Sequence, residues 1–119
     1  MKDYVYWAIE MAIVPGRAEA MKTLVKEMVP TMEKISPRTL IYEFSFNKTD
    51  TVCHIFELFE DSAATMAHLD NFDKHFAKRM GEVCKAQRFV VYGNPGADVR
   101  KSLERFTPEY CDRLVGFFR

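Results

Sequence analysis

The order of hydrophobic periodicities along the chain constrains the fold most strongly. Strand-forming β-branched and aromatic residues dominate the segments 4–14, 40–46, 51–60 and 88–92. Over 17–35, and again over 63–69 and 72–83, apolar residues recur every three or four positions, which indicates amphipathic helices. The chain is therefore predicted to run βαββαβ.

The breaks between these segments carry their own signals. Pro15-Gly16 closes the first strand, and Asp61-Ser62 offers an N-cap for the second helical region. Pro30 lies inside the first helical pattern and predicts either a kink or an end followed by a restart. Whether Asp70-Asn71 bends or breaks the second helical region stays open.

A βαββαβ order is the ferredoxin-like arrangement, an α+β fold with a four-stranded antiparallel sheet in spatial order 4-1-3-2. Residues 1–95 hold this domain, and 96–119 form a C-terminal extension that we expect to pack on the same domain or on a dimer. Val99, Leu103 and Phe106 indicate one helix there, and Thr107-Pro108-Glu109 predicts the start of another. The apolar segment 114–118 could be a short strand or a docked terminus. The extension could also cover a cavity.

Charge and cysteine content exclude several classes of partner. The 119 residues carry 17 basic and 17 acidic side chains, so a broad basic surface for nucleic acid or for anionic membranes is not expected. No segment reaches the ~18 apolar residues of a membrane span. Three cysteines without a CxxC pair argue against a disulfide framework and predict a cytoplasmic protein.

The predicted sheet has one face that no helix covers. Both faces of the two central strands, 4–14 and 51–60, are largely apolar. A bare apolar face of several hundred Å² is uncommon on a soluble monomer. We therefore expect a homodimer that joins the bare faces about a two-fold axis. The alternative is that 96–119 folds back over the sheet.

A glutamate in the third strand and a histidine in the following helix carry the clearest motif. Phe56-Glu57-Leu58-Phe59-Glu60-Asp61-Ser62 leads into a helix that contains His68, eleven residues after Glu57. Together with Pro15-Gly16-Arg17, Tyr42, Phe72 and His75-Phe76, this stretch resembles the antibiotic biosynthesis monooxygenase family of the dimeric α+β barrel superfamily. The resemblance covers roughly residues 4–93.

This resemblance implies a cofactor-independent monooxygenase that acts on a small aromatic or quinol-type compound. Such a substrate can react with O2 once it is deprotonated, oriented and shielded from water. His68 is the candidate base for a phenolic proton, and Glu57 the candidate that orients it or binds substrate. Trp7, Tyr42, Phe72 and His75 are candidate substrate-binding residues. Each of these side chains also has a purely structural reading, as a packed or hydrogen-bonded part of the core.

Other functions stay open from the sequence. The chain could be a non-catalytic ligand-binding or dimerisation module of the same fold, or an isomerase or lyase on the same barrel. His68, His75 and Arg79 are not joined by a carboxylate or thiolate at ligand spacing, so no metal site is expected. Relatives that degrade haem would be expected to show tryptophan and histidine together in the second helix and asparagine in the first strand. This chain has neither.

Overall fold

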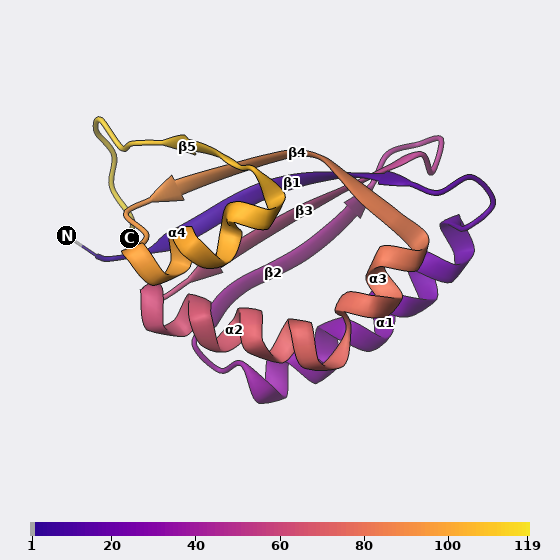
Figure 1. The fold of residues 1–119 in the computed structure, drawn as a ribbon, viewed down its shortest axis with the longest axis horizontal. Coiled ribbons are helices and arrows are strands. Elements are labelled where there is room, and N and C mark those ends of the chain that lie inside the picture. The colour runs from indigo at the N-terminus through magenta and orange to yellow at the C-terminus, as the bar shows by residue number, and fades with distance from the viewer. Residues whose placement is uncertain (1) are drawn as a thin grey trace.

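The computed structural model describes residues 2–119, which form a five-stranded sheet in the order β2-β3-β1-β4-β5 (Figure 1). The strands are β1 (Val5–Ile13), β2 (Thr39–Phe46), β3 (Val52–Phe59), β4 (Cys84–Gly93) and β5 (Glu109–Cys111). The helices are α1 (Ala18–Ile35), α2 (Ser62–His75), α3 (Ala77–Val83) and α4 (Ala97–Leu103), followed by the 3-10 turn Glu104–Phe106. The predicted fold class and the strand order 4-1-3-2 are confirmed.

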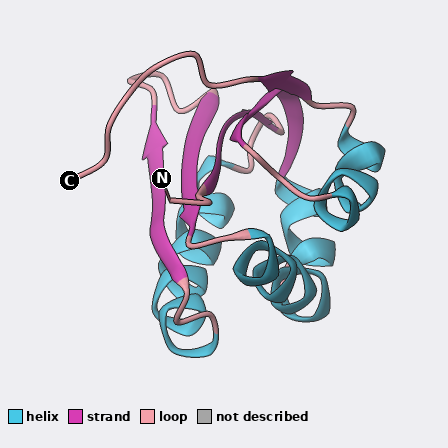
Figure 2. Ribbon diagram, turned by 90° about the vertical axis from the view of Figure 1, so that its left-hand side faces the viewer, coloured by secondary structure: helices cyan, strands magenta, loops and turns pink. Residues whose placement is uncertain are grey.

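All the helices lie on one side of the sheet. β1 pairs antiparallel with β3 and β4, β2 pairs antiparallel with β3, and β5 is parallel to β4. Viewed along its edge, the sheet has the helices against one face, while the C-terminal segment arches over the other (Figure 2). We call this second face the open face. None of the helices in residues 2–119 has the length and hydrophobicity needed to cross a membrane.

Neither Pro30 nor Asp70-Asn71 ends a helix. α1 runs through Pro30 to Ile35 without ending, and α2 runs through Asp70-Asn71. The break falls at Phe76 instead, where φ is −134°. Asp61 caps α2 as predicted, because its side chain accepts a hydrogen bond from the Ala64 amide at 2.8 Å. The cap fixes where α2 starts and so which of its side chains face the sheet.

The second half of the C-terminal extension differs from the prediction. The first predicted helix is present as α4 and its 3-10 turn, but Thr107-Pro108-Glu109 does not begin a helix. Thr107 has a positive φ of 44°, which ends the turn, and Glu109–Cys111 then pairs with Val90–Tyr92 of β4. The free backbone groups of an edge strand favour such pairing. The sheet is therefore mixed and has five strands, where the sequence predicted an antiparallel one with four.

Two clusters of buried side chains form the core between sheet and helices. One lies under α1 and α3 and includes Met28, Met32 and Met80. The other lies under α2 and α4 and includes Trp7, Phe59, Phe89 and Leu103. The extension contributes Val99 and Leu103, both fully buried, to the second cluster.

Gly93 is a position where only glycine fits the backbone. Its φ is +84°, and an added Cβ would lie 2.2 Å from the Tyr4 carbonyl oxygen. We expect Gly93→Ala to lower the free energy of unfolding by at least about 2 kcal/mol. Gly81→Ala in α3 is the matched control, because an added Cβ there meets nothing within 4 Å. The control should stabilise the helix by about 0.5–1 kcal/mol. Urea unfolding measures both, and equal effects would contradict the prediction.

Candidate functional site

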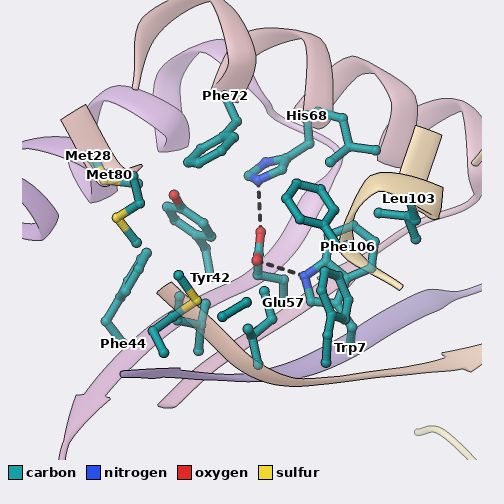
Figure 3. Close-up of a pocket in the computed structure, with 16 residues that line it drawn as sticks. Trp7, Met28, Tyr42, Phe44, Glu57, His68, Phe72, Met80, Leu103 and Phe106 are labelled. Atoms are coloured by element: carbon teal, nitrogen blue, oxygen red, sulfur yellow. Dashed lines mark hydrogen bonds and ion pairs between the residues drawn. The ribbon is translucent and has the colours of Figure 1, made fainter. Parts of the chain in front are cut away.

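A cavity of about 90 Å³ lies between the sheet and the helices, at the junction of the two core clusters (Figure 3). One end is lined by thioether and aromatic side chains, among them Met28, Met80 and Phe44. The other end is lined by Trp7, Phe89, Leu103 and Phe106. The polar groups that line the cavity lie mainly between these two apolar ends.

Pairing register gathers three of the lining side chains into one row across the sheet. Trp7 of β1 is the direct partner of Glu57 of β3, and Tyr42 of β2 is the partner of Glu57 on its other side. Residues paired in this way point to the same face of a sheet. The row therefore presents an indole, a carboxylate and a phenol side by side to the cavity.

Glu57 receives one polar contact from the sheet and one from the helix. The Trp7 Nε1–H donates to Glu57 Oε2 at 2.7 Å, and His68 Nε2 lies 2.8 Å from Glu57 Oε1. Glu57 is only 6% exposed and His68 only 1%. A carboxylate buried this deeply is tolerated because both of its oxygens have hydrogen-bond donors.

His68 is held on its other side as well. It lies on the buried face of α2, and its Nδ1 is 3.1 Å from the Thr39 hydroxyl at the start of β2. The rings of Tyr42 and Phe59 pack against the imidazole, with centroids 5.1 and 4.9 Å away. Both ring nitrogens are thus engaged within the protein. The Thr39 hydroxyl can donate or accept, so it fits either tautomer of the imidazole.

The arrangement leaves hydrogen-bonding capacity for a ligand on two groups. A carboxylate has about four acceptor positions, and Trp7 and His68 occupy two of those on Glu57. Tyr42 has no hydrogen-bond partner for its hydroxyl within residues 2–119. Burial, with a smaller contribution from the Glu57 charge, raises the pKa of Tyr42 far above its ordinary value. The phenol therefore stays protonated and can donate a hydrogen bond.

The structure brings together five of the six side chains that the sequence singled out. Trp7, Tyr42, Glu57, His68 and Phe72 all line the cavity. His75 does not: it is exposed at the end of α2, with its ring near Phe76. His75 is the last residue of α2, and at the break that follows it is Phe76 that packs into the core.

Sequence reasoning missed two contributions to the site. Thr39 was not among the predicted site residues, because only the position of β2 against α2 shows that its hydroxyl reaches His68. Leu103 and Phe106 were recognised as helical, but not as one wall of the cavity. No cluster of three or more His, Cys, Asp or Glu side chains suited to a metal ion occurs in residues 2–119.

The cysteines lie away from the cavity. Cys53 and Cys84 are buried and Cys111 is half-buried, and all three are free thiols. Burial raises the pKa of Cys53 to about 11 and that of Cys84 to about 12. Both thiols are therefore protonated at neutral pH and poorly reactive.

A scan against protein-family models and a search of the curated proteins found no match for the chain. Solved structures do match it. MupZ from Pseudomonas fluorescens is 23% identical, with a TM-score of 0.88, over 100% of this chain and 91% of that one. The whole C-terminal extension is therefore within the region matched to MupZ.

Two further matches connect the fold to named oxygenases. A Bacteroides thetaiotaomicron protein assigned to antibiotic biosynthesis monooxygenases is 18% identical, with a TM-score of 0.64, over 80% of this chain and 90% of its own. A variant of SnoaB, a cofactor-independent oxygenase from Streptomyces nogalater, is 11% identical, with a TM-score of 0.64, over 80% of this chain and 96% of its own. The chain thus has the fold of the antibiotic biosynthesis monooxygenases, as the resemblance of its sequence predicted.

Proposed function

We propose that this protein is a cofactor-independent monooxygenase for a small aromatic or quinol-type substrate. The observation that carries the proposal is the Glu57 carboxylate, which is buried in an apolar cavity and retains free acceptor positions. The fold shared with SnoaB supports the same class of chemistry. We also propose a cytoplasmic location, because three free thiols are typical of a reducing compartment.

In this proposal Glu57 is the base that contacts the substrate. Both nitrogens of His68 are already engaged, so His68 acts as a positioning residue that holds the carboxylate by hydrogen bonding. Trp7 has the same role from the sheet. The Tyr42 hydroxyl donates to a substrate oxygen and stabilises the negative charge that develops there.

The oxidation balances without an external reductant. Glu57 removes a proton from the substrate, and the electron-rich carbon of the anion forms a bond to O2. Cleavage of the resulting O–O bond leaves one oxygen on carbon as a carbonyl and releases the other as water. For a single-ring hydroquinone the product is a hydroxyquinone: conversion of the hydroquinone to the quinone level supplies two of the four electrons that O2 accepts, and oxidation of the attacked ring carbon supplies the other two. The hydrogen of that ring carbon and one phenolic hydrogen leave in the water.

The cavity favours a small substrate. Its volume of about 90 Å³ is well below the ~300–1,000 Å³ of pockets for drug-sized ligands. A single ring fits this space better than a polycyclic compound. Methionine side chains at one end can adapt their shape to the substituents of that ring.

A second candidate is an isomerase or lyase that uses the same groups without O2. The Glu57 carboxylate and the Tyr42 hydroxyl, which line the same cavity, favour it, because a base and a hydrogen-bond donor are what proton abstraction next to a carbonyl requires. A non-catalytic ligand-binding module is the remaining alternative. It would bind aromatic compounds, detected as a thermal shift, without converting them.

Oxygen uptake with a panel of single-ring hydroquinones tests the proposal. The protein should consume O2 with at least one of them, and His68→Ala should slow the reaction, because Glu57 then loses the donor that positions it. Turnover without oxygen uptake would favour the isomerase or lyase. No turnover of any compound, or an unchanged rate in the variant, would contradict the monooxygenase assignment.

We further propose that the protein is a homodimer joined through the open face. Tyr6, Phe56 and Tyr92 form an aromatic strip there, with ring centroids 5.4 and 6.4 Å apart. Phe118 packs edge-on to Tyr6, the central ring of the strip, with centroids 5.7 Å apart, so the extension covers only part of the face. Burial of the remainder against a second copy would favour association.

A further inference from the structure

The last eight residues, 112–119, carry the most exposed large apolar side chains within residues 2–119. Leu114 is 92% exposed, Val115 85% and Phe117 75%. We call this segment the C-terminal arm. Its exposed side chains amount to a few hundred Å² of apolar surface, which is comparable to the largest patch on a typical monomer. Such a patch indicates a contact surface.

The arm is anchored beside the open face. Phe118 packs edge-on against Tyr4, with ring centroids 4.9 Å apart, and against Tyr6. The arm follows β5, which forms one edge of the sheet (Figure 2). Its remaining apolar side chains have solvent around them in the single subunit.

A second exposed apolar site lies at the opposite edge of the sheet. Leu40 is 49% exposed and Ile41 is 41% exposed, both on β2. Ile41 pairs with Leu58, whose side chain points away from the helices because its neighbour Glu57 points toward them. Ile41 therefore belongs to the open face.

We propose that in the homodimer each C-terminal arm docks on the β2 edge of the second copy, with Leu114, Val115 and Phe117 against Leu40 and Ile41. A two-fold axis parallel to the strands places the β5 edge of one sheet over the β2 edge of the other. The symmetry then forms this contact twice, and each copy supplies one arm and one β2 edge.

The two arm contacts also add apolar area to the dimer interface, which the open face alone supplies only in part. Glu10, Glu43 and Arg88 make the half of the open face away from Phe118 polar. A stable interface buries about 1,200–2,000 Å² in total. The two arms, at a few hundred Å² each, add substantially to what the aromatic strip alone can bury.

This inference rests on the proposed homodimer, and cross-linking between two variants tests it. Each variant gains one exposed cysteine and keeps the buried Cys53 and Cys84. In a Cys111→Ser background, Val115→Cys protein is mixed with Ile41→Cys protein and treated with a short bifunctional maleimide. We expect at least tenfold more cross-linked dimer than in a mixture of Val115→Cys with Lys26→Cys, an exposed position on α1. Since each partner carries only one of the two new cysteines, the product must join different subunits.

Sedimentation of the unmodified chain separates the two ways of failing. A single subunit at micromolar concentration would overturn the homodimer. A dimer whose Val115–Ile41 cross-linking does not exceed the Lys26 control would overturn only the docking of the arm. Val115→Cys that cross-links to itself would place the axis across the strands and also overturn this docking. As a second measurement, Leu114→Ser with Phe117→Ser should raise the dimer dissociation constant at least tenfold.

Discussion

Replacing Glu57 by Gln is expected to lower the rate of substrate oxidation by about 10²–10⁴-fold, the usual contribution of a general base. The amide has nearly the same shape but cannot take a proton from the substrate. We expect the fold to survive, because the amide oxygen can accept from Trp7 while the amide NH2 donates to His68. The Thr39 hydroxyl can accept from the other tautomer of the imidazole, so both ring nitrogens stay satisfied.

Single-turnover rates with the best hydroquinone substrate, together with thermal unfolding, measure this effect. Glu43→Gln is the control, since Glu43 lies one residue from Tyr42 on the same strand but is exposed on the open face. The control should keep its full rate. If the Glu57 variant reacted as fast as the unmodified protein, Glu57 could not be the base, and the proposed mechanism would fail.

A chain that ends at Pro95 is expected to lose about 3–6 kcal/mol of its free energy of unfolding. Val99 and Leu103 are fully buried, and each contributes about 1.5–3 kcal/mol by leaving water. Their removal also uncovers Trp7 and Phe89, which pack beneath α4 and its turn. This loss is a large share of the ~5–15 kcal/mol that stabilises an ordinary domain.

The matched control is a chain that ends at Asp112 and lacks only most of the C-terminal arm. It should lose no more than about 1 kcal/mol, since Phe118 is the one arm side chain whose aromatic ring contacts the sheet. Urea unfolding at low protein concentration compares the two truncations without a contribution from dimerisation. Equal stability of the Pro95 chain and the full chain would show that the extension is not part of the core.

Much of the fold could be predicted because its signals are local. The alternation of residues in 40–46 predicts a strand, and the spacing of apolar residues in α1 predicts a helix. Neither prediction depends on what the element packs against. β5 could not be predicted in this way. Its three residues form a strand only because the edge of β4 is available, while Thr107-Pro108-Glu109 alone favours a helix start. Pro30 likewise shows that packing of a long amphipathic face can override a local helix breaker.

The candidate site was only partly predictable for a related reason. The spacing of Glu57 and His68 is visible in the sequence because a strand, a short turn and a helix follow one another directly. That Trp7, Glu57 and Tyr42 form one row depends on register between strands that are distant in sequence. His75 matched the motif, but it is the last residue of α2 and its side chain is exposed, which depends on where the helix breaks.

The two donors to Glu57 have a consequence for folding. One comes from a strand 50 residues away in the sequence and the other from the helix that follows, so neither partner alone satisfies the carboxylate. If the pairing of β3 shifted by one residue, or if α2 packed on the sheet in a rotated orientation, the Glu57 carboxylate would be buried among apolar side chains without a hydrogen-bond donor. Trp7, Glu57 and His68, to which we assign the proposed chemistry, therefore also penalise misassembled forms of the protein.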